Sequence, residues 1–259
     1  MSTSQRPDPV DIVVADIANV LRDNSGLLGL DVDGVLAPIT AHADHAHIDP
    51  HTLATVHLLA AHRHVAIVSG RTVDDLVRFD FDPSLSVIGS HGGQRRGTAD
   101  IPLDPDERSR CDAVVGLCRA AADACGDGAW VEIKPYGAVL HWREVDRGHG
   151  DTTIRRLHDE LSSRAGVWVT IGHRVVEATV RHASKATAMR ALATEFGTTR
   201  MAYIGDDRTD EDVFAVLTAD DVGVHVGDAD TLARRSLSSP IEVAACLDGL
   251  AAALGLTAE

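Results

Sequence analysis

The sequence predicts an α/β fold, with a parallel sheet covered by helices on both faces and a second, α+β module inserted into it. Over residues 1–97, short apolar runs alternate with segments of helical spacing, which is typical of a parallel sheet. From about residue 98 to about residue 179 the order changes to helix, two strands, helix, two strands. The first pattern then resumes. We therefore expect a core of residues 1–97 and 180–259 and a separate domain of residues 98–179.

The first part of the core is predicted from the spacing of its apolar residues. Val14, Ile17 and Leu21 recur at helical spacing, which indicates a helix over residues 11–23. A short apolar run follows and is read as a buried strand. The remaining expected elements are strands over 27–30, 64–68 and 85–88, and helices over 50–64 and 72–78.

The inserted module is predicted from two long helical patterns and two hairpin-like turns. Pro135, Tyr136 and Gly137 separate one pair of strands, and Gly172 and His173 separate another. The expected elements are helices over 105–125 and 152–164, and strands over 130–134, 138–143, 167–171 and 174–180. The core then continues with helices over 184–196, 210–217, 231–237 and 242–254, and strands over 201–204 and 221–226.

The charge balance excludes some classes of partner. The formal net charge of −15 argues against broad binding of nucleic acid or of anionic membranes, because phosphates would be repelled. An anionic small substrate stays possible where local cations or a metal overcome that field. The beginning, MSTSQRPDPVDIV, has no basic segment followed by an apolar one, so we expect no signal peptide. No apolar stretch is long enough to span a bilayer.

The cysteines indicate a reducing compartment. Cys111, Cys118 and Cys125 are spaced by seven residues and share one face of a predicted helix, and Cys246 is distant from them in sequence. Such neighbours are poor disulfide partners, and no CxxC pair suggests zinc. We therefore expect buried free thiols in a cytoplasmic protein.

Two acidic clusters each follow a predicted strand. Asp31 and Asp33 come after the strand over 27–30, and Asp206, Asp207 and Asp210 come after the strand over 201–204. If the two strands are neighbours, these carboxylates converge at one edge of the sheet. Like charges that close need a cation, and hard oxygen ligands suit Mg²⁺. The alternative for either cluster alone is an acidic, solvated loop.

Other residues after strands fit the chemistry of a phosphate ester. A carboxylate that attacks a phosphoryl group needs donors for its other oxygens and an acid for the leaving alcohol. Ser69 with Gly70 offers a hydroxyl and a backbone N–H, and Lys185 offers a cation at a helix start. Asp33 can donate a proton to the leaving oxygen and later accept one from water. A structural role is the alternative for a lone Ser or Lys.

Four segments in this order resemble a known superfamily. DVDGVL, SGR, Lys185 and GDDRTDEDVF look like the four signature motifs of the haloacid dehalogenase (HAD) phosphatases, over the whole chain. GDDRTDEDVF, GSHG and VEIKPYGAVLHWR together resemble the trehalose-6-phosphate phosphatases. The resemblance implies a Rossmann-like core with a C2-type cap. It also implies Mg²⁺-dependent hydrolysis of trehalose 6-phosphate to trehalose and phosphate, through an aspartyl phosphate.

The resemblance also implies roles for the acidic residues. Asp31 is then the nucleophile and Asp33 the general acid/base. Asp31, the backbone carbonyl of Asp33, and Asp206 hold Mg²⁺. Asp207 and Asp210 support the metal site from behind.

Substrate contacts follow from the same resemblance. Ser69 and Lys185 bind the phosphoryl group. By the alternation of a strand, Glu132 and Lys134 share one face of residues 130–134. That face suits sugar hydroxyls, and a solvated sheet face with cross-strand ion pairs is the alternative. The implied substrate-binding residues are Arg71 and His91 in the core, and Glu132, Lys134, His141 and Glu177 in the cap.

The chain departs from the family pattern in four places. Val35 replaces the usual Thr or Ser after DxDG, which removes a hydroxyl but no metal ligand. Gln94 stands where Glu is usual after HGG, and Ala186 follows the lysine in place of Gly. Thr179 and Val180 replace an Arg-Pro-like pair. These departures leave phosphatase activity expected and put the identity of the sugar in question.

Alternatives to the trehalose reading stay open. One is a related capped phosphatase that acts on sucrose 6-phosphate, a glycosyl phosphoglycerate or a pseudo-disaccharide phosphate. Another is a non-catalytic sugar-phosphate sensor, against which the presence of Asp31, Asp33, Lys185 and Asp206 argues. The third is an acidic scaffold without a site. We expect a small-molecule sugar phosphate as partner and no nucleic acid or membrane. The sequence favours a monomer without fixing the oligomeric state, and it leaves open an association with a separate synthase.

Overall fold

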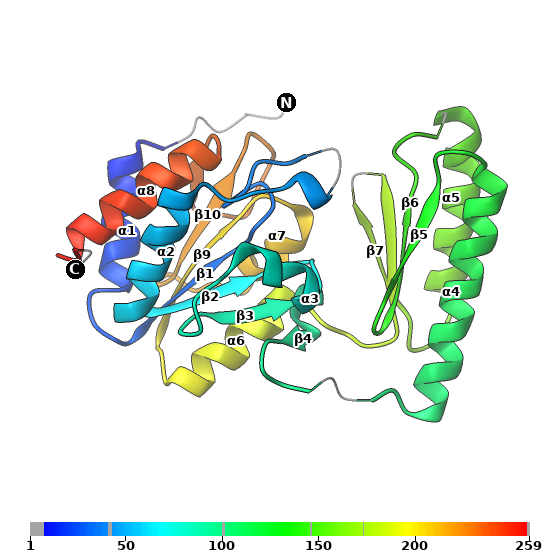
Figure 1. Ribbon diagram of the computed structural model, residues 1–259, viewed down its shortest axis with the longest axis horizontal. Coiled ribbons are helices and arrows are strands. Elements are labelled where there is room, and N and C mark those ends of the chain that lie inside the picture. The colour runs from blue at the N-terminus through cyan, green and yellow to red at the C-terminus, as the bar shows by residue number, and fades with distance from the viewer. Residues whose placement is uncertain (1–7, 41–42, 100–101, 146, 173, 258–259) are drawn as a thin grey trace. The chain divides into compact units, whose positions relative to one another are not determined.

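The chain divides into two compact units. The computed structural model describes residues 8–40, 43–99, 102–145, 147–172 and 174–257, with no side-chain account of residues 147–149. The first unit, the core, comprises Met1–Thr98 and Ala183–Glu259, and the second, the cap unit, comprises Ala99–His182 (Figure 1). Each is described by itself below.

The core is built on a sheet whose strand order is β11-β10-β9-β1-β2-β3-β4 in the described part of the chain. All neighbouring pairs are parallel except β3 with β4, so the expected parallel sheet is confirmed. Strands β2, β3 and β4 follow one another on one side of β1, and strands β9, β10 and β11 follow one another on its other side. The strands are β1 (Gly26–Leu30), β2 (His64–Val68), β3 (Ser86–Gly89), β4 (Gln94–Arg95), β9 (Arg200–Gly205), β10 (Val222–Val226) and β11 (Arg235–Leu237).

Helices cover both faces of this sheet, which explains why every residue of β1 is buried. Leu28 and Leu30 face an apolar cluster that includes α1, α2 and α8, whereas Leu27 faces a second cluster that includes α6 and α7. The helices are α1 (Val10–Val20), α2 (Pro50–His62), α3 (Val73–Leu76), α6 (Lys185–Phe196), α7 (Arg208–Phe214) and α8 (Pro240–Ala253), with short 3₁₀ turns η1 (Ala43–His45), η2 (Val77–Phe79) and η3 (Ser90–Gly92).

Two capping boxes fix the beginnings of the helices that carry site residues. Ser184 caps α6 by accepting the backbone N–H of Thr187, so Lys185 becomes the first residue of the helix. Asp207 caps α7 in a box with Asp210. Both helices therefore begin where the sequence places a charged group.

The expected helix over residues 231–237 is wrong. Residues 235–237 form the edge strand β11, in which Ser236 pairs with His225 of β10. The turn before it is fixed by Glu211, which accepts hydrogen bonds from the Thr231 hydroxyl at 2.6 Å and the Leu232 backbone at 2.8 Å. These hydrogen bonds hold the chain out of a helix. Strand β4 was not expected, because two residues are too short to show a periodicity.

The cap unit contains an antiparallel sheet with the order β5-β6-β8-β7. Leu140 and Val176 belong to its apolar cluster with Cys118 of helix α4. Because side chains alternate along a strand, Val139 lies on the opposite face of β6 from Leu140. The elements are α4 (Pro105–Cys125), β5 (Trp130–Lys134), β6 (Gly137–His141), α5 (Arg147–Ser162), β7 (Trp168–Gly172) and β8 (Val175–Thr179). His173, expected in the second turn, lies outside the described residues.

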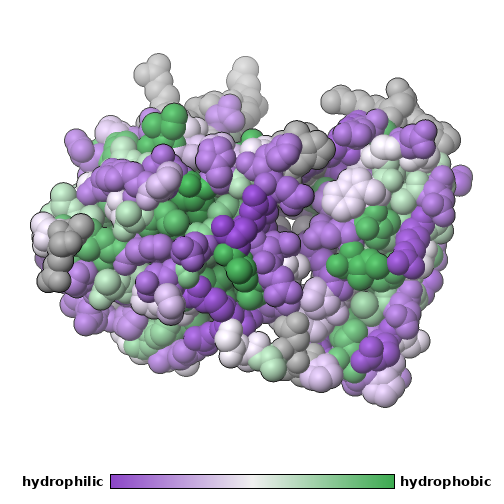
Figure 2. Space-filling model, in the orientation of Figure 1, coloured by the Kyte–Doolittle hydropathy of each residue, from purple (hydrophilic) through white to green (hydrophobic). Residues whose placement is uncertain are grey.

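The surface is mixed in character. Figure 2 shows hydrophilic residues over much of the visible face of the core, with hydrophobic ones scattered among them. Within the described ranges, no helix is both long and apolar enough to cross a bilayer.

Candidate active site

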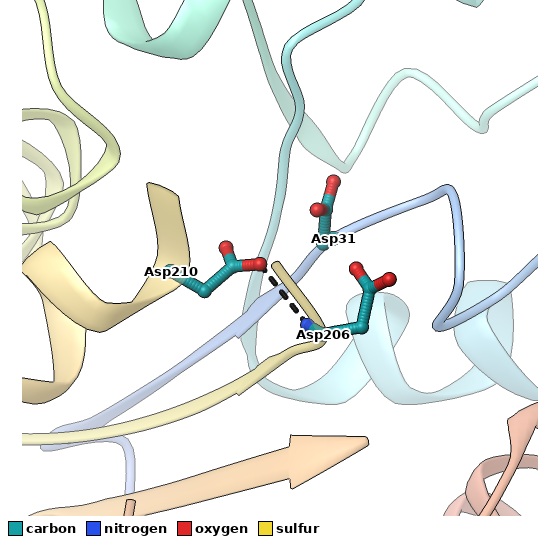
Figure 3. Close-up of side chains that lie close together, drawn as sticks. All are labelled: Asp31, Asp206 and Asp210. Carbon is teal, nitrogen blue, oxygen red and sulfur yellow. Dashed lines mark hydrogen bonds between the residues drawn. The ribbon is translucent and has the colours of Figure 1, made fainter. Parts of the chain in front are cut away.

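Asp31 and Asp206 meet at the carboxyl edge of the core sheet. Strands β1 and β9 are parallel neighbours, with Leu30 opposite Ile204, so the residues that follow them emerge together. The Asp31 N–H donates to the Ile204 carbonyl at 3.0 Å. One oxygen from each of Asp31, Asp206 and Asp210 lies within 4.8 Å of the others (Figure 3). The convergence expected from the two acidic clusters is therefore present.

Lys185 connects two of these carboxylates. Its Nζ donates to Asp31 Oδ2 at 2.6 Å and to Asp210 Oδ1 at 2.8 Å, and the residue is 2% exposed. Burial alone lowers the pKa of Lys185, but the charges and hydrogen bonds of Asp210 and Asp31 outweigh it and raise that pKa above its usual value. Lys185 is therefore a fixed cation beside Asp31.

Asp210 is fully occupied by hydrogen bonds. Its Oδ1 accepts from Lys185 and from the Tyr203 hydroxyl, the latter at 2.6 Å, and its Oδ2 accepts from the backbone N–H groups of Asp206 and Asp207, both at 3.0 Å. Burial acts to raise the pKa of Asp210, but Lys185 and the Tyr203 hydroxyl outweigh it and lower that pKa. Asp210 thus orients its neighbours, and its oxygens have little capacity left for a metal.

The other two carboxyl groups, Asp31 and Asp206, are harder to ionise than usual. Burial raises the pKa of Asp206 to about 8, reinforced by the charges of Asp31 and Asp210. Burial likewise raises the pKa of Asp31 to about 7, although Lys185 opposes that shift. Buried carboxylates that disfavour their own ionisation suit a hard divalent cation with oxygen ligands. The residues present therefore fit Mg²⁺.

Two glycines leave room for these carboxylates. Gly34 has φ +73°, and a Cβ built there would lie 1.9 Å from Asp206 Oδ2. A Cβ on Gly205 would lie 2.3 Å from the carboxyl carbon of Asp210. A side chain at either position would occupy the space of a site carboxylate, so glycine is required at both.

Asp33 lies beside Arg71 at the edge of this cluster. Arg71 Nε donates to Asp33 Oδ2 and Arg71 Nη2 donates to Asp33 Oδ1, each at 2.7 Å. The Arg71 side chain is 10% exposed and the Asp33 side chain 40%, and the guanidinium lies 5.4 Å from the centre of the Phe79 ring. Sequence reasoning assigned Arg71 to the substrate and missed this pair. Spacing along the chain carries no signal for it, because 38 residues separate the partners.

Ser69 and His91 lie in two turns that contact one another. The backbone of Ser69 is fixed, since its N–H donates to the Ile88 carbonyl and its own carbonyl accepts from the His91 N–H, both at 3.0 Å. The Ser69 hydroxyl accepts from the Arg71 N–H at 3.2 Å. The His91 ring lies so close to Gly70 that a Cβ there would meet it at 2.5 Å. Both turns follow neighbouring strands, β2 and β3.

Val35 and Asp207 have side chains that contribute to folding: one packs in the core and the other caps a helix. Val35 is fully buried in the apolar cluster that includes α1 and α8, so its side chain packs in the core. The Asp207 carboxylate accepts from the Arg208 N–H at 2.7 Å as the cap of α7. Asp207 therefore contributes to the site through its backbone contact with Asp210.

Four polar residues of the cap unit share the sheet face opposite its helices. Glu132 Oε2 lies 3.0 Å from His141 Nε2, and Lys134 Nζ lies 3.5 Å from Glu177 Oε1. Glu132 and Glu177 lie in one cross-strand row, on either side of Val139. Cross-strand ion pairs are therefore present on this face.

The fold and the acidic site define a class of protein. The core sheet with its inserted α+β unit is the fold of solved sugar phosphatases. A solved HAD subclass IIB sugar phosphatase matches with a TM-score of 0.57 and 14% identity, over 89% of this chain and 98% of that one. A C. albicans trehalose-6-phosphate phosphatase C-terminal domain matches with a TM-score of 0.81 and 20% identity, over 99% and 100%.

The particular family is shown by sequence. Residues 29–241 match the trehalose-phosphatase family, and the chain belongs to that family. This confirms the resemblance inferred from the motifs. A trehalose 6-phosphate phosphatase of Zea mays is 30% identical over 250 residues, which cover 86% of this chain and 68% of that protein. An uncharacterized glycosyl hydrolase of Mycobacterium tuberculosis is 30% identical over 263 residues, 95% of this chain, but the chain spans only 20% of that protein.

Proposed function

We propose that this chain is a Mg²⁺-dependent phosphatase that hydrolyses trehalose 6-phosphate to trehalose and phosphate through an aspartyl phosphate on Asp31. The observation that carries the proposal is the contact of buried Asp31 with Lys185, in a chain of the trehalose-phosphatase family. A buried carboxylate next to a fixed cation can approach an anionic ester that the rest of this acidic chain repels.

In the first chemical step, a carboxylate oxygen of Asp31 attacks phosphorus and the bond from phosphorus to the sugar oxygen breaks. Asp33 donates a proton to that oxygen, so trehalose leaves as a neutral alcohol. The hydrogen bond from Lys185 to Asp31 orients the nucleophile and offsets negative charge. Ser69 offers its hydroxyl to a phosphoryl oxygen.

In the second step, water attacks phosphorus of the aspartyl phosphate. Asp33 accepts a proton from that water, which restores its starting state, and the bond between phosphorus and Asp31 breaks. Inorganic phosphate leaves and Asp31 is a carboxylate again. The two hydrogen bonds from Arg71 fix the orientation of the Asp33 carboxylate, the form that accepts this proton.

Mg²⁺ would be held by the carboxylates of Asp31 and Asp206 and the backbone carbonyl of Asp33. Its charge would offset repulsion between those carboxylates and the phosphoryl oxygens. Asp210 supports this set from behind, because its Oδ2 holds the backbone of Asp206 and Asp207.

Recognition of the sugar is assigned to the cap unit. Glu132, Lys134, His141 and Glu177 present acceptors and donors on one sheet face, as sugar hydroxyls require. Arg71 and His91 are assigned to the core side of the substrate. The four buried free cysteines support a cytoplasmic location for the reaction, because a reducing compartment keeps thiols unpaired.

A panel of phosphate esters tests the proposal. Phosphate release is measured from trehalose 6-phosphate, sucrose 6-phosphate, glucose 6-phosphate, glucosyl phosphoglycerate and p-nitrophenyl phosphate, each with Mg²⁺ and with excess chelator. Trehalose 6-phosphate should give the highest kcat/KM, and only with the metal. A higher kcat/KM on another sugar ester would show that this ester, and not trehalose 6-phosphate, is the substrate. No turnover of any ester would contradict the enzyme and favour a protein that only binds sugar phosphates.

A further inference from the structure

We propose that Trp130 determines specificity by stacking the open face of its indole on a pyranose ring of the substrate. The proposal rests on the proposed function and deepens it, since it names a side chain that recognises the sugar by shape and apolar contact. Trp130 lies on the same face of β5 as Glu132, two residues along the strand.

The His141 ring covers one face of the Trp130 indole, and the residue remains half exposed. The His141 ring stacks on it with centroids 3.9 Å apart and planes within 4° of parallel. His141 is the cross-strand partner of Trp130 on β6, and β5 is the edge strand of its sheet. No strand of the described sheet therefore flanks the opposite face of the indole. Trp130 is 55% exposed, which is unusual for a residue of this size.

Polar groups suited to sugar hydroxyls adjoin this ring. Glu132 Oε2 is paired with His141 Nε2 at 3.0 Å, which fixes the carboxylate and the imidazole together. Among the described residues no hydrogen bond reaches the other carboxylate oxygen of Glu132. That oxygen is an acceptor beside a flat apolar surface.

A pyranose ring matches this arrangement. Its flat faces present C–H groups, and its rim presents hydroxyls that donate and accept hydrogen bonds. An aromatic face next to a fixed carboxylate therefore contacts both parts of the ring at once. A small aryl phosphate lacks the hydroxyl rim, so it gains little from the same pair.

A purely structural role is the alternative, in which Trp130 only stabilises the sheet as the cross-strand neighbour of His141. The other tryptophans give the contrast. Trp142 packs in the apolar cluster of the cap unit and lies under the Arg174 guanidinium. Trp168 is 43% exposed and meets His182 edge-on at 5.6 Å, and its strand partner is Thr179. Trp168 is therefore the comparison residue: an exposed tryptophan on the other edge strand, β7, whose cross-strand partner is Thr179 and whose indole has no ring of the described residues stacked on it.

The experiment compares kcat/KM for trehalose 6-phosphate and for p-nitrophenyl phosphate in wild type, Trp130→Ala, Trp130→Phe and Trp168→Ala. Trp130→Ala should lose about tenfold on the sugar ester, with KM carrying most of the change, and far less on the aryl ester. Trp130→Phe keeps an aromatic face and should recover most of the loss. Trp168→Ala should lose less on the sugar ester than Trp130→Ala, since in the described part of the chain no ring is stacked on the Trp168 indole and its cross-strand partner is Thr179.

Equal losses on both esters would overturn the proposal and leave Trp130 a structural residue, as would a Phe variant no better than Ala. Trehalose titrated against intrinsic fluorescence gives a second readout, in which wild type and Trp168→Phe respond and Trp130→Phe loses most of the signal. Turnover by the wild type tests the proposed function separately. If another sugar ester is turned over faster, the same variants are compared on that ester.

Discussion

Arg71 donates two hydrogen bonds of 2.7 Å to the two carboxylate oxygens of Asp33. A guanidinium that binds both oxygens fixes the plane of the carboxylate as well as its position. Asp33, the proposed acid and base, follows strand β1 and is thus oriented by Arg71, which follows strand β2. A residue assigned from sequence to the substrate therefore also has a partner inside the protein.

Arg71→Lys should lower kcat about tenfold on every ester, because a lysine keeps the charge but loses the paired geometry. The measurement is steady-state kinetics with a small aryl ester, so that sugar binding does not enter. Arg95→Lys is the control, since Arg95 pairs with Glu195 through two nitrogens elsewhere on the core. Wild-type kcat in Arg71→Lys would contradict the orienting role.

Asp31→Asn should lower kcat by about 10⁴-fold or more, because an amide is not a nucleophile toward phosphorus. Rapid quenching of the wild type during turnover should trap an acid-stable phosphoprotein that the variant lacks. Asp123→Asn, at an exposed position of α4, serves as control. Turnover at the wild-type rate in Asp31→Asn would show that another group attacks.

Chelation of Mg²⁺ should abolish turnover, and saturating Mg²⁺ should raise Tm by about 5 °C, because a ligand of the folded state stabilises it by mass action. The physical reason is that burial, reinforced by the charges of Asp31 and Asp210, raises the pKa of Asp206 to about 8, and a cation would relieve this cost. Asp206→Asn removes one charge and one strong ligand. Its Tm should respond far less to Mg²⁺ by calorimetry, and an undiminished response would place the ion elsewhere.

Glu107→Gln should destabilise the protein at pH 7 and much less at low pH. The Arg181 side chain, with the Asp104 N–H, lowers the pKa of Glu107 from 4.5 to about 2. A carboxyl group whose pKa is lower in the folded than in the unfolded protein stabilises the folded state when it is ionised. The stabilisation from Glu107 is therefore complete above about pH 4.5 and is lost as the pH falls toward 2. Urea unfolding across that window should show the two curves converging. Glu160→Gln, in an exposed helix pair with Arg164, should show a smaller gap at pH 7.

The four cysteines should resist a thiol reagent in the native protein. Burial raises the pKa of Cys118 to about 11 and that of Cys246 to about 12. At pH 8 a thiol of pKa 11 is about one part in a thousand thiolate, which is the reactive form. Labelling with a chromogenic disulfide at pH 8 should therefore be slow until denaturant is added, when all four react. Fast labelling without denaturant would mean that the helix α4 face opens readily.

The sequence predicted the parallel sheet and the meeting of Asp31 with Asp206 because both follow from strand ends. A buried apolar run marks a strand, and the residues after parallel neighbours share one edge. Lys185 is predictable for a different local reason, as the first residue of a helix. Local pattern and sheet topology suffice for such residues.

Pairings between distant side chains were beyond that reasoning. The Arg71–Asp33 pair depends on the path of two turns, which no periodicity encodes. Residues 231–237 were expected to be helical because their propensity is permissive, but Glu211 holds the preceding turn and β10 pairs with the rest. Trp130 carried a signal that was overlooked: a large aromatic on the polar face of a predicted strand.

Lys185 bonds to Asp31 across 154 residues of chain, and the whole inserted unit lies between them. Asp31, the proposed nucleophile, is synthesised early, whereas Lys185, Asp206 and Asp210 are synthesised late. A nascent chain that has emerged only as far as the inserted unit therefore carries the proposed nucleophile without the three residues that contact or adjoin it. We therefore expect phosphatase activity only after residues 183–259 have folded onto residues 1–98, so that turnover measures the completed folding of the core.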